Sequence, residues 1–185
     1  MKDLNHDLID RVWELASKRH SGQTYGSIVE GERIEYMTHI GRVALETSWA
    51  LSLDGAADPN LALPCAILHD TIEDTGTSHA ELAEAFGSAI ADGVLALSKD
   101  ERLPGKGAQM ADSLRRIRLQ PREVWMVKLA DRIANLGQPP HYWSNEKILA
   151  YRDEAVVIRE ALGTASADLA LRLDGRIEAY PRFVR

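Results

Sequence analysis

Residues 66–75 constrain this chain more than any other stretch, and they read Ala-Ile-Leu-His-Asp-Thr-Ile-Glu-Asp-Thr. The run begins apolar, as a buried helix does, and then places ionisable side chains at four of six positions. On a helix, a residue lies beside the residue four positions later, so His69 would lie near Glu73, and Asp70 near Asp74. Desolvating three acids and a histidine is costly. Two interpretations remain: a solvated helix end, or a site in which His69 and Asp70 offer nitrogen and oxygen to one divalent cation.

Length and composition are those of a globular protein. The 185 residues are 45% hydrophobic and 27% charged, which predicts one domain over 1–185 with a sizeable core. The net charge of −6 argues against a nucleic-acid surface, because such a surface needs a basic face. An anionic small substrate is compatible with this charge if lysines and arginines gather at the site.

Neither a secretory signal nor a membrane span is predicted. Residues 1–7 are polar and acidic, and the longest apolar run, residues 61–68, is far shorter than a bilayer requires. The single Cys65 cannot form an internal disulfide and lies in that apolar run, so we expect a buried packing residue in a reducing compartment. The expectation is a cytoplasmic protein without a membrane or nucleic-acid partner.

Apolar residues at helical spacing predict an all-α bundle of about 8 to 10 helices with no significant sheet. Residues 21–31 are expected to form a loop, Pro64 to lie near the start of its helix, and Ser78 with Glu81 to form a capping box. The helix that contains Pro64, the third along the chain, is expected to carry His69 and Asp70 at its polar end. The other helices are expected over residues 8–20, 36–51, 78–87, 88–98, 108–118, 122–136, 145–162 and 165–180.

The helix expected over 122–136 carries an unusual polar stripe. Apolar residues share one face of it, and a lysine, an aspartate, an arginine and an asparagine share another. Taken alone, an exposed surface stripe explains this pattern as well as a site does. His39, on the second helix, is by itself more often a satisfied core residue than a ligand. The polar residues of the stripe are Lys128, Asp131, Arg132 and Asn135.

Together, His39, His69-Asp70 and Asp131 stand in order on three expected helices, and two imidazoles with two carboxylates suit a first-row divalent cation. This order resembles the HD-domain metal-dependent phosphohydrolases. The motifs His-Asp-Thr-Ile-Glu-Asp-Thr and Lys-Leu-Ala-Asp-Arg-Ile-Ala-Asn-Leu resemble the hydrolase half of RelA/SpoT proteins, and most closely the stand-alone small alarmone hydrolases of the metazoan SpoT-homologue type. The resemblance covers nearly the whole chain, including Ala85-Phe86-Gly87, Leu103-Pro104 and the segment around Trp143.

This resemblance implies a single HD domain that removes the 3′-pyrophosphate from (p)ppGpp, giving GDP or GTP. A bound divalent ion lowers the pKa of water from 15.7 towards about 7, which supplies hydroxide at neutral pH. The ion implied is Mn²⁺, held by His39, His69, Asp70 and Asp131.

The remaining polar residues then acquire candidate roles. Glu73 and Asp74, one turn beyond the ligands, are placed to orient the water and to transfer protons. Lys128 and Arg132 are candidates to offset phosphate charge, and Asn135 to hydrogen-bond the base or ribose of a phosphorylated nucleotide.

One segment departs from the family pattern. These hydrolases carry Arg-Lys after a Gly-Gln and then a short link to the metal-binding histidine, whereas here Gly22-Gln23 is followed by Thr24-Tyr25 and a longer link. Ile40 also stands where a proline is usual. Because the basic pair contacts the nucleotide in the family, we expect weaker binding of ppGpp, with Arg33 as a candidate substitute.

Three classes of function therefore remain after sequence analysis. The first is an alarmone pyrophosphohydrolase, and the second is an HD phosphohydrolase for another phosphorylated nucleotide or phosphate ester. The third is a non-catalytic nucleotide-binding regulatory protein, which the presence of all four ligands and both acids disfavours. The sequence leaves the metal, the physiological substrate and a homo-oligomeric state open.

Overall fold

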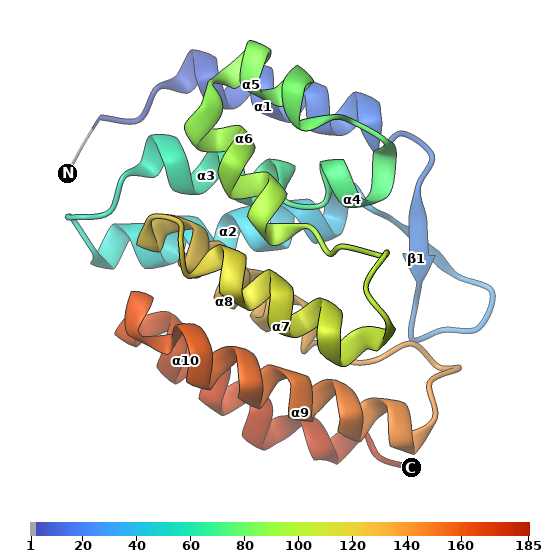
Figure 1. The fold of residues 1–185 in the computed structure, drawn as a ribbon. Helices are drawn as coiled ribbons and strands as arrows, with labels where there is room; N and C mark the ends of the chain where they lie inside the picture. Colours follow the sequence, from blue (N-terminus) through green and yellow to red (C-terminus); the bar gives the residue numbers. More distant parts are fainter. Residues whose placement is uncertain (1–2) are drawn as a thin grey trace.

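The computed structural model describes residues 3–185, and most of this part of the chain is helical (Figure 1). The expected all-α fold is confirmed. A two-stranded hairpin and two short 3₁₀ turns complete it. The elements are α1 (His6–Arg19), β1 (Thr24–Gly26), β2 (Arg33–Glu35), α2 (Met37–Leu53), α3 (Pro59–Leu68), α4 (Thr71–Thr75), α5 (His79–Phe86), α6 (Ser88–Leu97), α7 (Gly105–Ile117), α8 (Arg122–Asn135), α9 (Asn145–Leu162), η1 (Gly163–Ala165), α10 (Ala167–Ala179) and η2 (Tyr180–Phe183).

Helices α2, α3 and α8 pack against one another at the centre of the fold. Helices α1 and α6 cover α3, and α9 and α10 cover α8, so that α1 and α9 lie towards opposite ends of the molecule (Figure 1). Seven of the ten residues of α3 are buried, which explains why its sequence is apolar on all sides. One apolar core extends from Val12 to Tyr180 and joins both ends of the described chain. No helix in residues 3–185 combines the length and apolarity needed to cross a membrane.

The run at 66–75 is not one continuous helix, contrary to expectation. Helix α3 ends at Leu68, and α4 begins at Thr71 after a turn in which Asp70 has φ −99° and ψ −2°. The amide of Asp74 still donates to the carbonyl of Asp70, at 2.8 Å. The apolar half is therefore buried in α3, while the acidic half forms a separate short helix at the edge of the core.

Pro64 does not lie near the start of its helix, contrary to expectation. The helix begins at Pro59, where a proline loses no hydrogen bond, and the side chain of Asp58 accepts a bond from the amide of Asn60. Pro64 lies inside the helix and removes only the bond that its own amide would make. The capping box of Ser78 and Glu81 is confirmed.

Part of the expected loop at 21–31 belongs to a short hairpin. Strands β1 and β2 are antiparallel, with Tyr25 opposite Ile34. A Cβ on Gly26 would lie 2.6 Å from the ring of Tyr142, so this glycine permits direct contact between the hairpin and the segment 138–143. The amide of His141 also donates to the carbonyl of Ser27, at 3.4 Å.

Crowding around Gly93 provides a test of the central packing. An ideal Cβ at this position in α6 would lie 2.7 Å from Cys65 Sγ and 3.0 Å from Val124 Cγ2. We expect Gly93→Ala to lower the free energy of unfolding by up to about 2 kcal/mol in urea denaturation, because overpacking costs about 1–3 kcal/mol and helix propensity returns about 1 kcal/mol. Gly175→Ala in α10 is the matched control, because a Cβ there meets nothing within 4 Å and should stabilise the helix. Equal stabilisation by both substitutions would contradict this packing.

Candidate metal centre and adjoining cavity

Three of the predicted ligands converge where α2, α3 and α4 meet. His39, His69 and Asp70 each offer one ligand atom, and these atoms all lie within 4.8 Å of one another. The Nε2 atoms of the two histidines are 3.2 Å apart, and His69 Nε2 lies 2.9 Å from Asp70 Oδ2. Ligand atoms that share one ion at about 2.1 Å lie roughly 3 Å apart, so this donor set fits a divalent cation.

Asp131 approaches the same cluster from α8. Its Oδ1 lies 3.5 Å from His39 Nε2 and 3.8 Å from His69 Nε2. Its Oδ2 lies 3.0 Å from Lys128 Nζ, and Asn135 Nδ2 donates to Oδ1 at 2.6 Å. We call His39, His69, Asp70 and Asp131 the His–Asp cluster. Lys128, Asp131 and Arg132 are all buried, so the interpretation of this stripe as an exposed surface is wrong.

Neighbouring groups fix the orientation of the cluster. His69 Nδ1 lies 2.8 Å from the carbonyl of Ala66, which places the proton on Nδ1 and leaves the Nε2 lone pair facing the cluster. The hydroxyl of Tyr36 donates to Asp70 Oδ2 at 2.6 Å. Sequence analysis missed Tyr36, although its position one turn before His39 could have indicated it.

The electrostatics of the cluster favour a cation. Burial opposes ionisation of Asp131, but Lys128 and the two imidazoles outweigh it and hold the pKa of this carboxyl far below its usual value. Burial also opposes a charge on His69, yet Asp70 and then Asp131 raise its pKa to about 9. The cluster therefore attracts a proton. The same two nitrogens and two carboxylates could instead share a metal ion.

A cavity of about 690 Å³ opens above the His–Asp cluster. The hairpin, the segment 137–143 and helices α2, α4, α7, α8 and α9 all contribute to its wall. His69, which is 3% exposed, lies behind this wall. The other predicted site residues line the cavity: His39, Asp70, Asp131, Glu73, Asp74, Lys128, Arg132 and Asn135.

The two predicted catalytic acids differ in their surroundings. Glu73 accepts hydrogen bonds from the amide of Lys99 at 2.8 Å and from its Nζ at 2.9 Å, so its carboxylate is held in place. Partial desolvation and the nearby charge of Asp70 raise the pKa of Asp74. A raised pKa suits a group that accepts a proton near neutral pH.

Sequence analysis missed two aromatic residues that lie in the same cavity wall as Arg132. Its guanidinium lies 4.2 Å from the ring centre of Tyr151, and it reaches Glu154 at 3.4 Å. Tyr180 of η2 lines the same cavity, and its buried hydroxyl has no hydrogen-bond partner in residues 3–185. Burial raises the pKa of Tyr180 to about 12. In the sequence, both tyrosines look like ordinary core residues on amphipathic helices.

The hairpin does not supply the expected cation. Arg33 donates from Nε to Thr24 Oγ1 and from Nη2 to the Thr24 carbonyl, each at 2.9 Å, and it does not line the cavity. Tyr25 does line it, and its ring meets Tyr36 edge-on. The structure therefore gives no support to Arg33 as a substitute for the basic pair.

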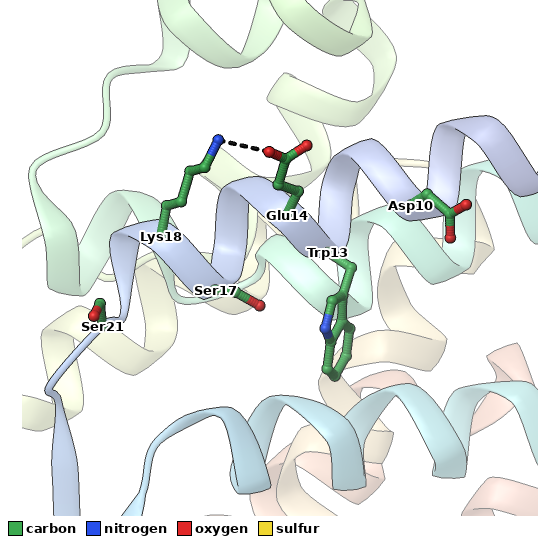
Figure 2. Close-up of a pocket in the computed structure, with 6 residues that line it drawn as sticks. All are labelled: Asp10, Trp13, Glu14, Ser17, Lys18 and Ser21. Atoms are coloured by element: carbon green, nitrogen blue, oxygen red, sulfur yellow. Dashed lines mark hydrogen bonds and ion pairs between the residues drawn. The ribbon is translucent and has the colours of Figure 1, made fainter.

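Another hollow, of about 500 Å³, follows α1 and contains none of the predicted site residues (Figure 2). Its lining comes from one helix and the turn after it. Lys18 and Glu14 form an ion pair at 2.6 Å, and Trp13 points towards α2 (Figure 2). This hollow is a surface groove apart from the His–Asp cluster.

Comparison with solved structures supports the fold. The structure of a metazoan orthologue of SpoT, described as hydrolysing ppGpp, matches with a TM-score of 0.80. The match covers 96% of this chain and 97% of the other, at 22% identity. At this level of identity the likeness establishes a common fold.

Sequence comparisons identify related proteins. The guanosine-3′,5′-bis(diphosphate) 3′-pyrophosphohydrolase MESH1 of Xenopus tropicalis is 28% identical over 90% of this chain and 91% of its own length. MESH1 of Danio rerio is 29% identical over 83% of each chain. The GTP pyrophosphokinase rsh of Brucella ovis is 34% identical over 72% of this chain, but this match covers only 17% of the larger relative. The HD domain family matches residues 12–165. The chain therefore belongs to the HD-domain family, which the order of its histidines and aspartates had indicated.

Proposed function

We propose that this protein is a metal-dependent phosphohydrolase that removes the 3′-pyrophosphate from (p)ppGpp. Water and ppGpp would give GDP and pyrophosphate, and pppGpp would give GTP. The observation that carries the proposal is the His–Asp cluster at the wall of a cavity of about 690 Å³, a size typical of small-molecule sites. Relatives of similar length that are named as 3′-pyrophosphohydrolases support the choice of substrate.

The four residues of the His–Asp cluster would hold one divalent cation. Two imidazole nitrogens and two carboxylate oxygens suit Mn²⁺, which is our proposal for the ion. When bound, such an ion lowers the pKa of water and offsets negative charge on phosphate oxygens. Lys128 and Asn135 keep Asp131 ionised and oriented towards the cluster.

The acids of α4 would handle the water and its proton. Glu73, held by Lys99, orients the attacking water through its carboxylate oxygens. Asp74 accepts the proton on a carboxylate oxygen, since its raised pKa makes this carboxylate a stronger base. Arg132, Lys128 and Asn135 face the substrate from α8, where they would contact its phosphate and ribose groups. The single domain over 1–185, the cytoplasmic location and a homo-oligomeric state stay predictions.

Removal of one ligand tests the metal centre. We expect His69→Ala to lose tightly bound metal and hydrolase activity together, because the remaining donors no longer close around the ion. Metal content after gel filtration, measured by mass spectrometry, gives the first readout. His79→Ala is the control, since this histidine of α5 pairs with Asp92 of α6, does not line the cavity and should leave both properties intact. A full equivalent of metal in His69→Ala would refute the assignment.

Neutralising Glu73 separates chemistry from metal binding. We expect Glu73→Gln to retain metal and to lose about 10²- to 10⁴-fold in kcat, the usual scale of acid–base assistance. Lys99→Met leaves the carboxylate in place without its cationic partner, so its loss should be smaller. Normal turnover by Glu73→Gln would show that Glu73 only holds Lys99 and takes no part in the chemistry.

A substrate panel tests the function itself. Purified protein with Mn²⁺ should convert ppGpp to GDP and pyrophosphate, as followed by anion-exchange chromatography, and chelation of the metal should abolish the reaction. The panel also contains other phosphorylated nucleotides, which test whether the protein prefers a different substrate. Absence of ppGpp turnover with every divalent metal tried, together with turnover of another nucleotide, would transfer the function to that substrate.

A further inference from the structure

The cavity has a balanced set of charges before any metal binds. Six acidic side chains line it, and six cationic side chains oppose them. A nucleotide that carries two phosphate groups adds several negative charges to this neutral wall. Binding therefore depends most on cations that neither an acid nor an aromatic ring of the protein already engages. The six cations are Arg42, Lys99, Lys106, Lys128, Arg132 and Lys147.

Four of these cations already have partners within the cavity wall. Three form ion pairs, and the fourth lies over an aromatic ring. The pairs are Lys99 with Glu73 at 2.9 Å, Lys128 with Asp131 at 3.0 Å, Arg132 with Glu154 at 3.4 Å, and Lys147 with the ring of Trp143 at 4.2 Å. Arg42 and Lys106 make no ion pair or hydrogen bond with any residue from 3 to 185.

Arg42 is the better placed of these two for a phosphate group. It lies on α2, one helical turn after His39, whereas Lys106 stands near the beginning of α7. The buried neighbours Ile40 and Val43 anchor this part of α2 in the core, while Arg42 itself is exposed. A guanidinium can also bind phosphate through two parallel hydrogen bonds, which a lysine ammonium cannot do.

We propose that Arg42 binds the phosphate group that is not cleaved, which in (p)ppGpp is the 5′-diphosphate or 5′-triphosphate. The His–Asp cluster serves the phosphate that is cleaved, so the second group needs a separate cation. Arg33 is bound to Thr24, and the hairpin places only Tyr25 and Gly26 in the wall. Arg42 thus compensates for the basic pair that the hairpin lacks, and it offsets the weak ppGpp binding expected from the sequence. This inference rests on the proposed function, because it requires a nucleotide with two phosphate groups.

Steady-state kinetics with two substrates provides the test. Wild type, Arg42→Ala and Arg42→Lys are compared on ppGpp and on guanosine 3′-diphosphate, which lacks the 5′ group. We expect Arg42→Ala to raise KM for ppGpp about 10- to 100-fold with kcat almost unchanged, as for loss of one charge-assisted bidentate contact. Arg42→Lys should recover part of this loss, and the KM for guanosine 3′-diphosphate should stay unchanged in both variants.

Direct binding of GDP separates this inference from the proposed function. GDP carries only the 5′-diphosphate, so calorimetry should show its Kd rising by about 10- to 100-fold in Arg42→Ala whether or not ppGpp is hydrolysed. Arg33→Ala is the matched control, because its guanidinium does not line the cavity. Unchanged GDP binding in Arg42→Ala overturns the inference, as does a KM loss that is equal for both substrates. A loss of GDP binding in Lys106→Ala alone would also overturn it, whereas failure of wild type to hydrolyse ppGpp refutes only the proposed function.

Discussion

The structure depends on holding two carboxylates and two imidazoles together where α2, α3, α4 and α8 meet, with His39, His69 and Asp131 buried and Asp70 half-buried. Removing one partner of a buried charged pair costs about 3–5 kcal/mol, so the charged groups of the cluster need partners close by. Asp131 has Lys128 and Asn135, Asp70 has the hydroxyl of Tyr36, and His69 has the carbonyl of Ala66. The apolar sides of the same helices supply the burial that holds these groups together.

In this arrangement, residues that the sequence suggested for substrate binding or catalysis also hold neighbouring side chains in place. Lys128 and Asn135 line the cavity, yet both are bonded to Asp131 at helical spacing. Glu73 is likewise bonded to Lys99. The polar residues near the cluster therefore act first on one another. The cations of the wall that have no such partner in residues 3–185 are Arg42 and Lys106.

Local pattern allowed most of the helices to be predicted. The capping box before α5 and the apolar spacing of α8 depend on neighbours a few residues away, and both were predicted correctly. The break after Leu68 was not, because neither glycine nor proline marks it in the sequence. The three-residue strands of the hairpin are too short to show an alternating pattern.

The candidate ligands could be chosen from the sequence because their residue types restrict the chemistry, although their assignment to a metal stays a prediction. Arg42 and Tyr180 could not be chosen in this way. Each side chain lines the cavity only because segments that are distant in the sequence meet around that cavity. The sequence next to Arg42 is that of any amphipathic helix, and the sequence next to Tyr180 is that of any chain end. Tyr180 also lies outside residues 12–165, the part matched by the family.

The contact of Gly26 with Tyr142 has a consequence for how this cavity can diversify. The backbone of strand β1 meets the ring of Tyr142 there, and both residues line the cavity, so their spacing sets the width of the cavity at this point. Substitutions of exposed charges such as Arg42 change the electrostatic potential of the cavity but leave this width alone. A larger residue at 26 would instead force β1 and the Tyr142 segment apart. Width and charge are thus encoded at separate positions, and selection could tune which molecules enter independently of how tightly their phosphates are held.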